Sequence, residues 1–231
     1  MRHEAFRSSA IPGPSGPDRI TNSLDKAGPI AVFGRALDPV IARAIDDLPL
    51  DLFPSLRTEG DVAEIDTALR SALADLRRLQ SWLEVWLRDD IAFLARLYSE
   101  LTGASTLALR LEPVTDDACR RFHADNVTYR LITTYRGPGT EWVSPRDAYL
   151  VEDGELSDVS ARRQLQRGWV GVLRGTKSAG SDAPALLHRS PPVRSREAAR
   201  LFLAIDDARD WPGGQPKPAP SVRRHEPRHG R

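Results

Sequence analysis

The spacing of hydrophobic positions along the chain changes at Gly103. Before this glycine, apolar residues recur every three or four positions, which is the spacing of helices that bury one face. After it, Leu107, Leu109 and Leu111 alternate with other residues, which indicates a strand with one buried face. The pattern therefore predicts an α+β protein in which helices precede strands.

Three helices are expected before Gly103. Their apolar stripes cover residues 38–48, 61–79 and 81–102. Asp38 followed by Pro39 predicts the first start, because an Asp side chain caps free N–H groups and proline fits the first turn. Asp61 and Glu64 have the spacing of a capping box at the start of the second helix. Gly103 itself is the expected stop of the third helix.

The second half of the chain predicts a set of short strands. They lie at residues 107–112, 127–135, 169–173, 185–188 and 201–205. Glycine- and proline-containing turns separate them, which is typical of an antiparallel sandwich or barrel. We therefore expect N-terminal helices packed on a C-terminal double-stranded β-helix, which is a jelly-roll or cupin-like pair of sheets.

Composition marks a tail at each end. Residues 1–28 are rich in Ser, Pro and Gly, and residues 208–231 are basic and lack apolar periodicity, so both are expected to be disordered. Between the tails, residues 29–207 are expected to form a single α+β domain. Its helical part would cover residues 29–103 and its β-helix part residues 104–207.

Charge and cysteine content narrow the class of protein. The net charge of +1 provides no overall field toward nucleic acid or anionic membrane, and the single cysteine, Cys119, excludes an internal disulfide. No apolar stretch approaches the roughly 18 residues that span a bilayer. These features predict a cytoplasmic protein without a membrane partner, in which Cys119 is a small buried residue. Only the basic C-terminal tail offers a contact to nucleic acid, and Pro227 argues against a helical metal pair of His225 and His229 there.

The candidate chemistry centres on His123, Asp125 and His188. Two imidazole nitrogens and one carboxylate oxygen form the ligand set of two-His, one-carboxylate iron sites, which leaves octahedral positions open for a chelating 2-oxo acid and dioxygen. The far carboxylate of such an acid needs a cation. Arg200, which opens the last expected strand, is the first choice, and Arg130 is the second.

The same region admits other interpretations. His123 and His188 could be satisfied at strand ends, and Asp125 could cap a turn with its neighbour. Glu141 could serve as a fourth ligand in a cupin-like site. The Gly-Pro-Gly sequence at 137–139 predicts a turn rather than a phosphate loop, because no Lys-Ser/Thr pair follows it. Arg194 and Arg196 are close to the second histidine in sequence, but their polar loop favours a solvated role.

The segment CRRFHADNVTYRLITTYRGPGTEW at 119–142, with LLHRSPP and RLFLAID after it, resembles a bacterial family known as domain of unknown function 1826. The resemblance covers about residues 30–207. The family name assigns no activity. Its members often occur together with zinc-homeostasis proteins, which implies a metal-linked role.

A broader similarity is to the double-stranded β-helix of 2-oxoglutarate/Fe(II)-dependent oxygenases. Their pattern is HxD, a long insertion, a second histidine and a basic residue on a late strand. His123, Asp125, His188 and Arg200 stand at the matching positions. The resemblance implies Fe(II) on the first three residues and the distal carboxylate of 2-oxoglutarate on the arginine.

The leading hypothesis is therefore a non-haem Fe(II)/2-oxoglutarate-dependent oxygenase-like protein whose substrate, a small molecule or a protein, is unknown. The alternative is a non-catalytic, zinc-linked protein that holds Zn(II) with the same residues on the same scaffold. A third interpretation is an interaction module, in which His123 and His188 would lie far apart. The separation of the two imidazoles discriminates the third interpretation from the first two.

Overall fold

A computed structural model describes residue 24 and residues 28–180, 183–193 and 199–211 of the chain. Most of both expected tails, including His225 and His229, lies outside the described residues, as do Arg194 and Arg196. Among the described residues, no helix is both long enough and apolar enough to cross a membrane.

The helices begin and end where their caps predict. They are α2 (Pro39–Asp47), α3 (Val62–Ala72), α4 (Ala74–Leu79) and α5 (Ser81–Thr102). Asp38 accepts from the backbone N–H of Val40, and the Asp61–Glu64 capping box is present. Gly103 closes α5 in the left-handed conformation, with φ of 73°. The second expected helix is divided, because Leu73 leaves the helical region with ψ of 17° and separates α3 from α4.

Eleven strands are described. They are β1 (Ile30–Phe33), β2 (Leu56–Gly60), β3 (Leu107–Val114), β4 (Tyr129–Arg136), β5 (Glu141–Val143), β6 (Val151–Glu152), β7 (Glu155–Leu156), β8 (Arg162–Gln164), β9 (Val170–Arg174), β10 (His188–Arg189) and β11 (Arg200–Asp207). Six form one antiparallel sheet in the order β1-β9-β4-β11-β3-β2, and three form a smaller sheet in the order β10-β5-β8. The strands β6 and β7 pair as a separate hairpin.

The first half of the chain contributes more than helices. Both edge strands of the six-stranded sheet, β1 and β2, come from it, whereas the sequence pattern predicted only helices there. Both edge strands are short, and each pairs with a strand that follows Gly103 in sequence: β1 pairs with β9, and β2 pairs with β3. A segment of four or five residues carries too few alternations to reveal such a pairing by itself.

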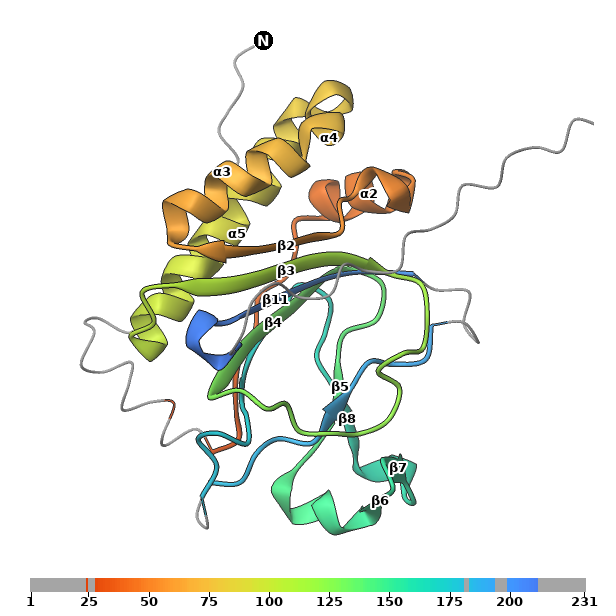
Figure 1. Cartoon of the computed structure of the whole chain (residues 1–231). Coiled ribbons are helices and arrows are strands. Elements are labelled where there is room, and N and C mark those ends of the chain that lie inside the picture. Colours follow the sequence, from red (N-terminus) through yellow and green to blue (C-terminus); the bar gives the residue numbers. More distant parts are fainter. Residues whose placement is uncertain (1–23, 25–27, 181–182, 194–198, 212–231) are drawn as a thin grey trace, which may run out of the picture.

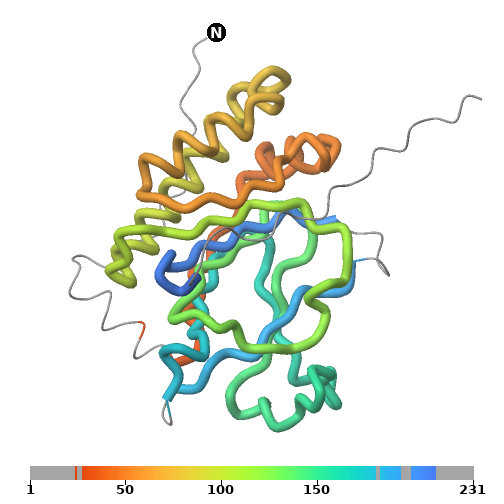
Figure 2. The backbone as a smooth tube through the Cα atoms, viewed as in Figure 1, coloured from red at the N-terminus to blue at the C-terminus, as the bar shows by residue number. Residues whose placement is uncertain are grey.

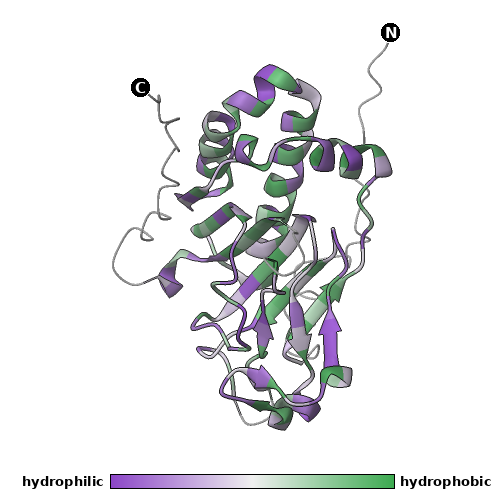
Figure 3. Cartoon of the chain, turned by 90° about the vertical axis from the view of Figure 1, so that its right-hand side faces the viewer, coloured by the Kyte–Doolittle hydropathy of each residue, from purple (hydrophilic) through white to green (hydrophobic). Residues whose placement is uncertain are grey.

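The helices cover one face of the six-stranded sheet, and the smaller sheet lies on its other side (Figure 1). A large core lies between helices and sheet, where leucines of α5 pack with Leu109, Leu131 and Leu203. Hydrophobic positions, green in Figure 3, recur along these helices and the strands beneath them. The opposite face of the sheet carries the intervening residues, among them Ile132 and Ala204, which pack in a second, smaller core. The expected class, α+β with a jelly-roll pair of sheets, is confirmed by this layered antiparallel arrangement.

The segment between β3 and β4 brings the two halves of the candidate site together. In Figure 2 this green segment runs beside the blue segment that includes β10. An isolated antiparallel bridge joins His123 to His188 there. Residues that are 65 positions apart in sequence, as their numbers show, therefore become neighbours through backbone pairing.

Candidate metal centre

The backbone fixes the two histidines relative to each other. The His123 N–H donates to the His188 carbonyl at 3.0 Å, and the His188 N–H donates to the His123 carbonyl at 2.9 Å. The centroids of the two imidazole rings lie 4.9 Å apart. The interpretation that requires distant histidines is therefore contradicted.

Both imidazoles are oriented in the same way. Nδ1 of His123 lies 2.9 Å from the carbonyl oxygen of Arg121, and Nδ1 of His188 lies 3.2 Å from that of Leu186. A carbonyl oxygen only accepts, so in each hydrogen bond Nδ1 carries the proton. In the neutral imidazole Nε2 is then a bare electron-pair donor, which is the usual preparation of a metal-binding histidine.

The carboxylate of Asp125 faces both Nε2 atoms. Its Oδ1 lies 3.5 Å from Nε2 of His123, and its Oδ2 lies 3.0 Å from Nε2 of His188. One ligand atom from each of the three residues lies within 4.8 Å of the others. Oδ2 is buried and has no correctly aligned hydrogen-bond donor. Three electron-pair donors that converge in this way fit a cation between them, and the donor set of two nitrogens and one oxygen fits a first-row divalent metal.

The local charges favour the ionised carboxylate. Burial opposes ionisation of Asp125, but contacts with His123 and His188, whose rings donate from Nε2 only in the protonated form, and the positive charge of Arg130 hold its pKa far below the usual range. The hydrogen bond with Asp125 also raises the pKa of His123. A carboxylate that stays ionised is always available as a ligand.

Arg130 supports this carboxylate from behind. Its Nη1 lies 2.7 Å from Asp125 Oδ2, while its Nε and Nη2 donate to the two oxygens of Asp206, both at 2.7 Å. Trp211 Nε1 donates to Asp206 at 3.1 Å. Both edges of the Arg130 guanidinium are thus occupied by carboxylates. The geometry therefore does not favour Arg130, the second choice, as the cation for the far carboxylate of a 2-oxo acid.

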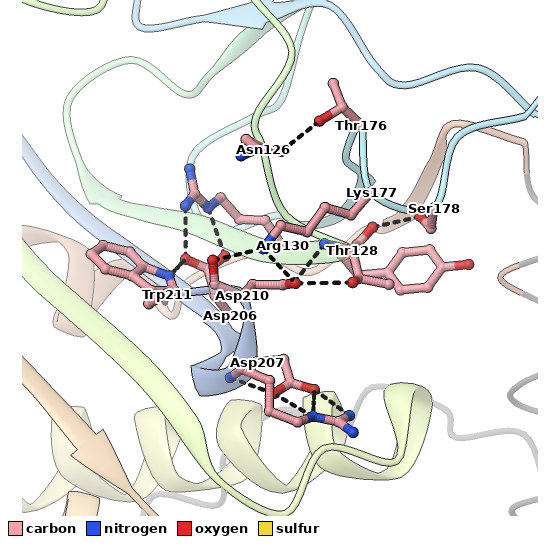
Figure 4. Close-up of polar contacts among 12 residues, drawn as sticks. Asn126, Thr128, Arg130, Thr176, Lys177, Ser178, Asp206, Asp207, Asp210 and Trp211 are labelled. Atoms are coloured by element: carbon pink, nitrogen blue, oxygen red, sulfur yellow. Dashed lines mark hydrogen bonds and ion pairs between the residues drawn. The ribbon is translucent and has the colours of Figure 1, made fainter. Parts of the chain in front are cut away.

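Figure 4 shows how this network continues. The carboxylate of Asp210 accepts from the backbone N–H of Thr128 at 2.5 Å, and Lys177 lies 3.1 Å from the same carboxylate. Thr176 donates to Asn126 at 3.1 Å. The segment that leads from Asp125 into β4 is thereby tied to the turn after β9 and to the short helical turn that follows β11.

Arg200 has a different environment. Its side chain is buried on β11, and the hydrogen-bond partners of its guanidinium among the described residues are the hydroxyl groups of Ser190, Thr134 and Thr140. Its Nε is buried without an acceptor, and within the described residues no carboxylate lies at ion-pair distance. Burial lowers the pKa of Arg200 to about 10. A buried cation with neutral partners alone is costly, which points to a binding role for an anion.

Two expectations are corrected. Glu141, considered as a fourth ligand, is fully buried but lies 2.8 Å from Arg189 and 3.2 Å from Arg162. His188 pairs directly with Trp142, so the side chain of Glu141, one position earlier on β5, points to the opposite face of the strand. Cys119, expected to be buried, is exposed because it lies in the loop between β3 and β4 rather than in a core strand.

Several residues around the site carry no local motif, namely Ser190, Thr134, Thr140 and Asp206. A partial signal exists in the strand RLFLAIDD, where Arg200, Phe202 and Asp206 fall on one face by alternation. Their partners come from other strands, so the alternation indicated the face but not the contacts.

A family model described as "Protein of unknown function (DUF1826)" matches residues 15–206. A search of the curated proteins found no match. Solved structures with a similar arrangement include the dioxygenase for auxin oxidation 1 from Arabidopsis thaliana with 2-oxoglutarate, at 10% identity and a TM-score of 0.48, over 84% of this chain and 89% of that one.

Two further structures are similar to this chain. A prolyl-4-hydroxylase from Pseudomonas putida has 13% identity and a TM-score of 0.38, over 87% of this chain and 98% of that one. HygX from Streptomyces hygroscopicus, with iron bound, has 12% identity and a TM-score of 0.42, over 81% of this chain and 86% of that one.

Proposed function

The chain belongs to the family described as "Protein of unknown function (DUF1826)", and we propose that this member is a non-haem Fe(II)- and 2-oxoglutarate-dependent oxygenase. The observation that carries the proposal is a pair of features in one fold. His123, Asp125 and His188 present three converging donor atoms, and Arg200 is a buried cation that has no carboxylate partner among the described residues.

The three donors would hold the metal through Nε2 of His123, a carboxylate oxygen of Asp125 and Nε2 of His188. The Nδ1 hydrogen bonds of the two imidazoles keep both rings turned inward, and Arg130 keeps the carboxylate ionised and oriented. A bound Fe(II) would supply the redox chemistry through which dioxygen and 2-oxoglutarate together oxidise a substrate.

Arg200 would receive the distal carboxylate of 2-oxoglutarate. A guanidinium binds a carboxylate through two parallel N–H donors, and burial strengthens that interaction because water does not compete. The hydroxyl groups of Ser190, Thr134 and Thr140 hold the arginine in place and offer further donors to the same anion. Binding would also supply the negative charge that this buried cation lacks.

A zinc-linked role without a cosubstrate is not favoured. It would use the same three donors, but it gives no reason for an arginine buried among hydroxyl groups. Placing such a charge in the interior costs free energy unless an anion compensates it. The arginine is therefore the feature that separates the two functions.

The test is an anaerobic titration of the full-length protein with Fe(II) and then 2-oxoglutarate. We expect a weak visible charge-transfer band that appears only when both are present. His123→Ala should abolish the band, and Arg200→Gln should shift its 2-oxoglutarate dependence to concentrations at least about tenfold higher. Arg43→Gln, an exposed change on α2, is the matched control and should behave as wild type.

Two outcomes would overturn the proposal. One is the absence of the band in a wild-type protein that metal analysis shows to contain Fe(II). The other is a band of equal strength in His123→Ala.

A further inference from the structure

The face of the six-stranded sheet that is turned away from the helices carries four arginines on neighbouring strands. They are Arg57 on β2, Arg110 on β3, Arg200 on β11 and Arg130 on β4. Arg130 is matched by two carboxylates. Each of the other three has a buried Nε that finds no hydrogen-bond acceptor in the described part of the chain. Buried donors in native proteins are nearly always satisfied, so three such atoms on one face require an explanation.

Arg57 and Arg110 form a pair of like charges. They are direct partners in the register of β2 and β3, a position where two cations repel. Within the described ranges, the one carboxylate at ion-pair distance from both is Glu112, 3.3 Å from Arg57 Nη2 and 3.6 Å from Arg110 Nε. Two cations therefore share one carboxylate, which leaves the pair with a net positive charge.

The pair is accessible in part. About a quarter of each arginine side chain is exposed, 25% for Arg57 and 23% for Arg110. Burial, together with the charges of Arg130 and Arg57, lowers the pKa of Arg110 although Glu112 opposes this. The two cations are therefore desolvated enough to gain from an anion and open enough to receive one from solvent.

Phe202 links this pair to the proposed cosubstrate site. The guanidinium carbon of Arg110 lies 5.4 Å from the centroid of its ring, and that of Arg200 lies 5.0 Å from the same centroid. Such contacts fix both guanidinium groups against an apolar surface. An anion on Arg110 would thus be a close neighbour of an anion on Arg200.

A purely structural role for the pair is the simpler interpretation. Glu112 could link β3 to β2 by accepting a hydrogen bond from Arg57 Nη2 at 3.3 Å, much as Asp206 links β11 to Arg130 on β4. That link accounts for Arg57 through one long hydrogen bond, whereas Arg130 binds Asp206 through two of 2.7 Å, and it does not account for Arg110, whose Nε lies 3.6 Å from Glu112. Nε of Arg110 is therefore left without a hydrogen-bond acceptor among the described residues.

We propose that Arg110, with Arg57 beside it, binds an anionic group of the substrate, a carboxylate or a phosphate, next to the cosubstrate on Arg200. This inference rests on the proposed function for the role of the anion as substrate, but the anion site itself does not. The substrate class would then be acidic small molecules or acidic groups on larger ones. Arg57 and Glu112 would position Arg110 and set the net positive charge.

The test is NMR of the arginine Nε–Hε signals of the full-length protein, loaded with Zn(II) as a redox-inert metal and with 2-oxoglutarate. Inorganic phosphate is titrated in one arm and malonate in the other, with chloride keeping the ionic strength constant. We expect saturable shifts of the Arg110 and Arg57 signals and none of the Arg130 signal. The arm that saturates at lower concentration identifies the preferred group.

Variants assign the signals and test the site. Arg110→Gln should raise the half-saturating concentration at least about tenfold, and Arg110→Lys should lie between it and wild type, because lysine keeps the charge but loses the planar fork. Arg43→Gln should match wild type. The inference is overturned if neither anion shifts Arg110, or if Arg110→Gln binds both as wild type does. A shift of Arg200 on addition of 2-oxoglutarate, together with no shift of Arg110 by either phosphate or malonate, would support the proposed function while rejecting the substrate site.

Discussion

Arg130 holds the carboxylate of Asp125 at 2.7 Å through one edge of its guanidinium and is itself held by Asp206 through the other. The candidate metal ligand is therefore buttressed by an ion pair that reaches from β4 to β11. Its orientation depends on tertiary packing rather than on the HxD sequence that contains it.

Replacing this arginine should weaken both the fold and the metal site. Arg130→Gln leaves two carboxylates without their cation, and loss of one partner of a buried pair costs about 3–5 kcal/mol. We also expect metal affinity to fall about 10- to 100-fold, as for other residues that orient a ligand. Urea denaturation and anaerobic Fe(II) titration measure the two effects.

The control is Arg43→Gln, which breaks an exposed ion pair with Asp47 and should change the free energy of unfolding by less than about 1 kcal/mol. Equal effects of the two substitutions would contradict the prediction.

Replacing Arg200 should weaken 2-oxoglutarate binding without destabilising the fold. Arg200→Met removes a buried charge that has only hydroxyl partners, and replacing buried charges by apolar side chains is often neutral or stabilising. We expect unfolding of the ligand-free protein to cost the same or more free energy. The dissociation constant for 2-oxoglutarate should rise at least about tenfold, as measured by calorimetry with Zn(II) present. Strong destabilisation with unchanged 2-oxoglutarate binding would assign Arg200 a structural role instead.

A glycine next to the site leaves no space for a side chain. A Cβ on Gly175 would lie 2.0 Å from the carbonyl oxygen of Val127 and 2.8 Å from that of Asp125. Gly175→Ala should therefore displace the segment that carries Asp125, the candidate metal-binding carboxylate, at a cost of about 1–3 kcal/mol, and weaken metal binding. Gly180→Ala is the matched control, since nothing lies within 4 Å of its Cβ. Thermal unfolding with and without Fe(II) compares the two variants, and equal responses to the metal would refute the displacement.

The stability of the protein should fall at high pH. Burial raises the pKa of Tyr98, whose hydroxyl donates to the carbonyl of Tyr129 at 2.8 Å. The folded state thus retains a proton that the unfolded state loses near pH 10. The contribution of the protonated Tyr98 hydroxyl to the free energy of unfolding is fully present below about pH 10. Above that pH it is lost by about 1.4 kcal/mol for each pH unit.

The comparison variant is Tyr98→Phe, measured by urea denaturation from pH 8 to 11.5. It should be less stable than wild type by about 1 kcal/mol at pH 8, because the hydrogen bond is lost. Above pH 10 this difference should shrink and then reverse. Tyr135, whose pKa is also raised by burial, remains in both proteins, so the difference isolates Tyr98. Parallel pH curves would show that Tyr98 ionises normally in the folded state.

Local sequence patterns predicted much of the fold. The caps at Asp38 and Asp61 and the stop at Gly103 lie where expected, because capping depends on residues within one turn. Alternating polarity likewise placed β3, and the apolar run at residues 201–205 placed β11. The pairing of β1 and β2 with distant strands escaped prediction, since nothing within a four- or five-residue edge strand encodes its partner.

The sequence by itself determined the family, the order of helices and strands, and the residue types of a two-His, one-carboxylate site. Only the tertiary structure decided which of these side chains meet. The His123–His188 bridge brings two of them together, Arg130 is engaged by two carboxylates, and Glu141 faces the other side of its strand. The reason is physical, because helical and strand periodicities act over a few residues. Charge pairing and burial, by contrast, depend on strands that only the folded chain brings side by side.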